Sequence, residues 1–122
     1  MSKLNLQMIW QGRVLAGHFI RKVQNGATAA GTNQATALQM TGDMLELTTV
    51  GSGAGVRLPQ SSPGMQVVII NAGANNVTVY TALEETGSPT INGTAGSTGV
   101  AQAHAPTVTI YSCPRAGIWY TK

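Results

Sequence analysis

The sequence predicts an all-β protein: a single antiparallel β-sandwich, expected to be a jelly roll, with an extended N-terminal arm. Apolar residues recur at every second position along much of the chain, which is the spacing of a strand with one buried face. Glycine, proline and asparagine interrupt these runs roughly every ten residues, as they do between the short strands of sandwiches. No segment keeps the 3.6-residue apolar spacing of an amphipathic helix. The 122 residues suffice for one domain.

The arm is expected over residues 1–23 and the sandwich over residues 24–122. Apolar residues alternate with polar ones at the start of the arm, which gives that segment one apolar face. These apolar residues are Leu4, Leu6, Met8 and Trp10. Every charged residue before Asp43 is basic, and these cations are Lys3, Arg13, Arg21 and Lys22. The arm can therefore lie on an acidic partner, or its scattered charges can simply be solvated.

Strands of the sandwich are expected where residues alternate in polarity or are β-branched. These segments are 18–23, 35–40, 44–50, 56–59, 65–71, 77–81, 107–113 and 118–121. The most apolar segment, Met65–Asn71, is expected to be a central strand. Residues 71–76 are rich in asparagine and glycine, which favours a hairpin to the next strand. The segments 25–34 and 94–105 are small and polar, and they are expected to be loops.

Charged residues are sparse, at 9% of the chain against about 25% in average usage. Interface cores are also depleted of charge, so this composition suits a protein whose surface is largely covered by neighbours. Cys113 is the single cysteine, which excludes an internal disulfide. We see no signal peptide and no apolar run long enough to span a bilayer. The protein is expected to be made in a reducing cytoplasm and to have no membrane partner.

The residues that could carry chemistry do not form a motif, so neither a catalytic site nor a metal or cofactor site is predicted. His18, His104, Asp43 and Cys113 could supply parts of a triad, but no nucleophile elbow is present. The acids and histidines lack the spacing of metal ligands. The run Gly51–Gly55 matches neither phosphate-loop spacing and is interpreted as a flexible turn.

Aromatic residues near basic ones could stack on nucleic acid bases. Trp119 and Tyr120, which lie near Arg115 and Lys122, come closest to this pattern. Packing in the core or in an interface is the alternative role for amphipathic aromatics. We predict no direct contact with nucleic acid.

Two blocks of sequence form a recognisable pattern. The first contains Arg57-Leu58-Pro59, Gly64, the segment VVIINAGANNVTVY over 67–80 and Ile91-Asn92-Gly93. The second is TVTIYSCPRAGIW over 107–119. Together they resemble small β-structured virion proteins of tailed bacteriophages. The resemblance covers about residues 25–120 and omits the arm, which could be the specific docking element. Such modules resemble both head decoration (cement) proteins and tail-associated proteins.

The resemblance implies a capsid decoration protein on the outside of a phage head, without enzymatic activity. It would form a homodimer or homotrimer and bridge subunits of the major capsid protein. The expected contact residues are Leu4, Leu6, Met8, Trp10, Arg13, Arg21, Lys22, Trp119 and Tyr120. A tail, baseplate or fibre accessory protein is the alternative. A receptor- or carbohydrate-binding module would normally carry more aromatic and acidic residues on its loops.

Overall fold

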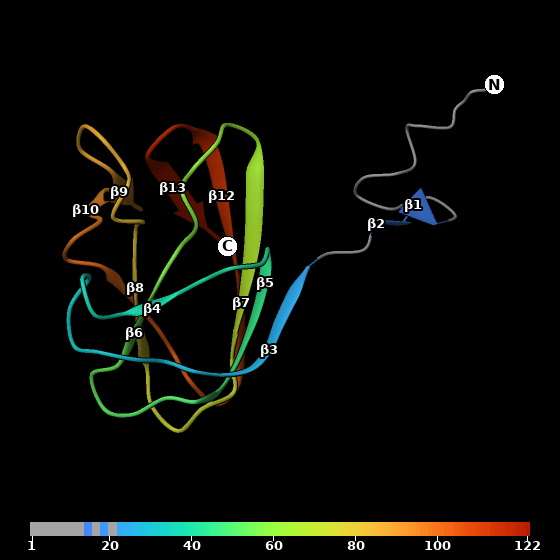
Figure 1. Cartoon of the computed structure of the whole chain (residues 1–122), viewed down its shortest axis with the longest axis vertical. Helices are drawn as coiled ribbons and strands as arrows, with labels where there is room; N and C mark the ends of the chain where they lie inside the picture. Colours follow the sequence, from blue (N-terminus) through green and yellow to red (C-terminus); the bar gives the residue numbers. More distant parts are fainter. Residues whose placement is uncertain (1–13, 16–17, 20–21) are drawn as a thin grey trace.

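The computed structural model describes residues 14–15, 18–19 and 22–122, and within them every regular element is a strand. Two sheets form the body of the protein (Figure 1). The larger comprises β3 (Val23–Thr28), β5 (Met44–Thr49), β7 (Met65–Asn71), β9 (Thr90–Ile91), β10 (Thr94–Ala95), β12 (Thr107–Arg115) and β13 (Ile118–Thr121). The smaller comprises β4 (Leu38–Gln39), β6 (Gly55–Arg57), β8 (Val77–Tyr80) and β11 (Val100–Gln102). A separate antiparallel pair joins β1 (Val14–Leu15) to β2 (His18–Phe19).

The strand order is β10-β9-β13-β12-β7-β5-β3 in the larger sheet and β11-β8-β6-β4 in the smaller one. Buried apolar side chains from both sheets belong to one hydrophobic cluster. The larger sheet contributes Leu45, Leu47, Val67, Ile69, Tyr111 and Trp119, and the smaller sheet contributes Val56, Val77 and Val79. An all-β protein with two sheets around a shared core is consistent with the predicted β-sandwich.

The chain passes from one sheet to the other at each step from β3 to β8. Strands two steps apart therefore lie side by side in the same direction. β3, β5 and β7 pair in parallel in the larger sheet, and β4, β6 and β8 do so in the smaller one. From β3 to β8 the chain therefore winds back and forth between two sets of parallel strands. The prediction of an antiparallel sandwich is wrong here, and the pairing departs from the antiparallel order of a jelly roll.

The predicted hairpin between β7 and β8 is likewise wrong, because these strands lie in different sheets. The asparagines of the connection shape a crossing instead of a tight return. The Asn71 side chain accepts a 3.0 Å hydrogen bond from the Gly73 N–H and donates one of 3.0 Å to the Asn75 carbonyl. Asn75 in turn donates to the Val50 carbonyl at 2.9 Å. Asparagine and glycine predicted the turn but not the strand to which it leads.

The longest antiparallel pairing of the fold is formed by β12, which pairs with β7 on one side and with β13 on the other. β11 with β8 and β10 with β9 are also antiparallel pairs. The register of β12 and β13 shifts between Ser112 and Arg115, where Pro114 has no N–H for the ladder. The strands predicted over 44–50, 65–71, 77–81 and 118–121 match β5, β7, β8 and β13. Two predicted loops contain strands: 25–34 holds most of β3, and 94–105 holds β10 and β11.

Candidate functional site

The outward face of the larger sheet carries exposed apolar side chains. On β12 the side chains alternate, so that Tyr111 is buried while Val108 and Ile110 are 63% and 38% exposed. On β13, Trp119 is buried and Tyr120 is 49% exposed. An isolated exposed apolar residue needs no explanation, but adjacent ones on neighbouring strands form a patch.

The strand register extends this patch across the sheet. Ile110 on β12 lies opposite Val68 on β7, Val68 lies opposite Met44 on β5, and Met44 lies opposite Val23 on β3. Val23, at the edge strand, is 50% exposed. A second row begins where Val108 lies opposite Ile70 on β7. We define the outer apolar face as the set Val23, Met44, Val68, Ile70, Val108, Ile110 and Tyr120. Within it Met44 and Ile70 are half-buried and Val68 is buried.

Charged residues stand at the margins of the outer apolar face. The backbones of Lys122 and Ile110 exchange two hydrogen bonds of 3.0 Å, so Lys122 lies beside Ile110 at the β13 side. Glu46, on β5, lies opposite Ile70 on β7, and the Glu46 carboxylate accepts a 3.1 Å hydrogen bond from the Gly26 N–H. Lys22 precedes Val23 at the β3 side and is exposed. The face therefore combines an apolar middle with charges of both signs around it.

The predicted contact residues fall into three groups. Leu4, Leu6, Met8, Trp10, Arg13 and Arg21 lie outside the described residues. Tyr120 lies on the outer apolar face and Lys22 at its margin. Trp119 is fully buried and belongs to the hydrophobic cluster, which corrects its assignment as a contact residue. The side chains of Trp119 and Tyr120 point to opposite faces because they are neighbours on one strand.

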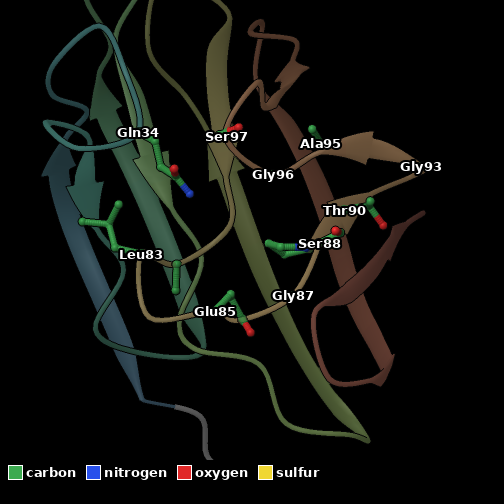
Figure 2. Close-up of a pocket in the computed structure, with 12 residues that line it drawn as sticks. Gln34, Leu83, Glu85, Gly87, Ser88, Thr90, Gly93, Ala95, Gly96 and Ser97 are labelled. Atoms are coloured by element: carbon green, nitrogen blue, oxygen red, sulfur yellow. The ribbon is translucent and has the colours of Figure 1, made fainter.

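A pocket of about 410 Å³ lies at the other side of the molecule, between the loop that follows β8 and the β9–β10 hairpin. Figure 2 shows Leu83 and Glu85 on that loop, with Gln34 and Ser97 across from them. Glu85 is the one ionisable side chain among the described residues that line the pocket. Backbone, glycine and small side chains make up most of the wall, so the pocket offers no paired acid and base.

The carboxylate of Glu85 serves to hold loops together. It accepts hydrogen bonds from the Ser61 N–H at 2.6 Å and from the Ser61 hydroxyl at 2.9 Å. The Ser61 Oγ in turn accepts a 2.7 Å bond from the Gly117 N–H. Three segments far apart in sequence are thus joined at one point. Glu85 is half-buried, and its contacts give it an anchoring role.

Asp43 and Cys113, two further candidates for chemistry, also have structural partners. The Asp43 carboxylate accepts a 2.8 Å hydrogen bond from the Lys22 N–H. Cys113 is buried, and its thiol donates to the Arg115 carbonyl at 3.0 Å. Over the described ranges, no three His, Cys, Asp or Glu side chains gather where they could hold a metal ion. No helix within those ranges is long and apolar enough to cross a membrane.

Of the outer apolar face, Tyr120 alone was predicted from the sequence to be a contact residue. A signal was present: the strand MQVVIIN is apolar at consecutive positions, whereas a strand with one solvated face alternates. The apolar residues of TVTIYSC also occupy both phases of the alternation.

Comparison of the chain with family models, curated proteins and solved structures finds no match.

Proposed function

We propose that the protein is a capsid decoration protein of a tailed phage, which binds the outside of the head and bridges subunits of the major capsid protein. The resemblance of residues 57–93 and 107–119 to phage virion proteins supports a tailed-phage virion as the particle to which the protein binds. The low charge of the chain, 9% of residues, supports a surface that neighbours cover. The proposal is one of binding without turnover.

The outer apolar face is the observation that carries an assembly role. A sheet that is solvated on one side usually alternates apolar and polar side chains. Here Val108, Ile110 and Tyr120 present apolar surface on two adjacent strands, at exposures between 38% and 63%. Leaving such a patch in water is costly, at about 25 cal/mol for each Å² of apolar surface. Contact with other subunits would recover that free energy.

The N-terminal arm, residues 1–23, is proposed as the element that docks on the capsid. Its apolar residues alternate with polar ones, so it can add as a strand to an exposed sheet edge of the major capsid protein. Main-chain hydrogen bonds would supply affinity, and the alternate side chains would set the register. Many copies on one shell would then bind with avidity, even where each contact is weak.

The copy number of the protein in purified virions tests its location. Quantitative mass spectrometry against the major capsid protein should give a ratio near one, or a simple fraction set by the symmetry of the shell. A few to a few tens of copies per particle would instead indicate a tail, baseplate or fibre component. Absence from the particles would overturn the proposal.

Deletion of residues 1–12 tests the docking arm. The shortened protein should no longer bind decoration-free heads, while its circular dichroism spectrum remains that of the full chain. A control of full length, in which Leu4, Leu6, Met8 and Trp10 are each replaced by serine, keeps the backbone but removes the apolar face. Loss of binding in both variants would support the arm. Unchanged binding after the deletion would refute it.

A further inference from the structure

The larger sheet has apolar side chains on both of its faces. Its inner face is covered by the smaller sheet, through the shared cluster that includes Leu45, Ile69 and Trp119. Its outer face carries Val108, Ile110 and Tyr120, which remain exposed. Sheets with two apolar faces occur where both faces are covered. The outer apolar face therefore requires a second layer.

The size of the outer apolar face fits a protein surface as its cover. The sheet surface that carries it comprises the five strands β13, β12, β7, β5 and β3, so this surface is about 24 Å wide and, along β5 and β7, about 20 Å long at ordinary strand spacing. That footprint is on the order of 500 Å², and the side chains standing on it present more accessible surface than their footprint. A stable interface takes ~800 Å² from each partner. The face and its charged rim together supply about this area.

The charges at the margins fit a second copy of the same chain. A two-fold axis parallel to the strands, between β7 and β12, would exchange those two strands and place β13 of one copy over β5 of the other. Lys122, beside Ile110, would then lie over the strand that carries Glu46 of the other copy. The same pair would form twice, as an isologous interface requires.

We propose that two copies of the protein stack through their outer apolar faces, with Val108 and Ile110 nearest the axis, Tyr120 on the flanking strand, and Glu46 paired with Lys122 of the other copy. Sheets that stack in this way lie about 10 Å apart, with their strands within about 30° of each other. The proposal names the self-associating surface and its symmetry. It does not depend on the location of the protein in a virion.

Sedimentation equilibrium of the full chain measures the association directly. The wild-type protein should have the mass of a dimer, and the double substitution Val108→Glu, Ile110→Glu should weaken dimerisation by at least roughly 100-fold, because carboxylates would then be buried against the apolar side chains of β7 in the other copy. Leu83→Glu is the matched control: Leu83 is also exposed but lies on the loop after β8, away from this face. It should leave the dimer unchanged.

Both substituted positions are exposed, so the double variant should keep its fold and the near-ultraviolet signal of its buried aromatics. A zero-length carbodiimide cross-link provides an independent measurement on the wild-type protein. In a mixture of ¹⁴N- and ¹⁵N-labelled chains, Glu46 should join Lys122 between copies. Within one chain the two residues lie on strands three places apart, roughly 14 Å at ordinary spacing.

Several results would overturn the proposal. A wild-type monomer at high micromolar concentration would do so, as would a trimer or a dimer that Val108→Glu, Ile110→Glu does not weaken. The variant with serine in place of Leu4, Leu6, Met8 and Trp10 tests the alternative that the N-terminal segment covers the outer apolar face. Loss of the dimer in that variant would assign the face to this segment and reject sheet-on-sheet stacking. If the free protein forms the dimer but does not bind phage heads, only the proposed function is contradicted.

Discussion

The hydroxyl of Tyr111 donates a 2.7 Å hydrogen bond to Oε1 of Gln102, and both side chains are buried. Gln102 belongs to β11 of the smaller sheet, whereas Tyr111 belongs to β12 of the larger one. The same glutamine donates a 2.8 Å bond from Nε2 to the Ile69 carbonyl on β7. The main-chain carbonyl of Gln102 accepts a 3.3 Å hydrogen bond from the Asn71 side chain. The two sheets are therefore joined by buried polar contacts as well as by the apolar core.

Replacement of Tyr111 by phenylalanine should lower the free energy of unfolding by about 1–3 kcal/mol, because Oε1 of Gln102 loses this buried donor. Urea denaturation followed by circular dichroism measures the change. Tyr120→Phe is the matched control, since Tyr120 is half exposed on the outer face, and it should change the stability of the monomer by less than ~0.5 kcal/mol. Equal effects of the two substitutions would show that the Tyr111–Gln102 bond contributes nothing.

The stability of the protein should fall at alkaline pH. Burial raises the pKa of Tyr111 above its ordinary value, because the charged phenolate is disfavoured away from water. The unfolded chain then loses this proton first, at a pH of about 10, so stabilisation by Tyr111 is complete below that pH and is lost as the pH rises beyond it. Urea midpoints from pH 8 to 11 should show the decline. Tyr111→Phe should make it shallower, and an unchanged slope would contradict the assignment.

Gly55→Ala should destabilise the fold by about 1–3 kcal/mol through crowding in the smaller sheet. A Cβ at this position would lie 2.7 Å from the Tyr80 ring and 2.9 Å from the backbone carbonyl oxygen of Thr78. Gly51→Ala is the control in the same glycine-rich segment, because a Cβ there would meet no atom within 4 Å. Thermal unfolding compares the two variants. A smaller loss for Gly55→Ala than for Gly51→Ala would be inconsistent with close packing of β6 on β8.

Ser61→Ala should loosen the loop that carries Glu85. The substitution removes the hydroxyl that donates to Glu85 and accepts from the Gly117 N–H, and each lost bond costs about 0.5–1.5 kcal/mol. Limited proteolysis should cut residues 82–89 faster in this variant than in wild type. Ser62→Ala alters the exposed neighbour and should leave the cleavage rate unchanged. Equal rates in both variants would argue against the anchor.

The sequence predicted individual strands better than it predicted their partners. The apolar run of β7 and the alternation of β13 are local patterns, and both strands were placed correctly. Parallel pairing depends on the sheet to which each connection leads, and no residue in 71–76 specifies that. The edge strand β3 was missed over 25–28 because its sequence, NGAT, is polar and contains glycine. Its position depends on pairing with β5, which local propensity does not report.

Most of the outer apolar face was not predicted from the sequence, for a similar reason. Val108 and Ile110 were expected to be strand residues, but which side of the strand met the core was settled only by the neighbours on β7 and β13. Trp119 was named as a contact residue, with core packing left open, because an amphipathic aromatic suits either place. In the structure the whole ring is buried, and its Nε1 has no hydrogen-bond partner within the described part of the chain.

The position of β7 between β5 and β12 has a consequence for how the molecule unfolds. In the smaller sheet β8 joins β6 in parallel to β11 antiparallel. In the larger sheet β7 has the same role, because it pairs in parallel with β5 and antiparallel with β12. Neither part of the larger sheet can open fully without breaking a ladder on this strand. The body should therefore behave as a single cooperative unit, in which the amide protons of β7 exchange only through global opening. A protein held together in this way would lose its tertiary contacts at one temperature instead of fraying from an end.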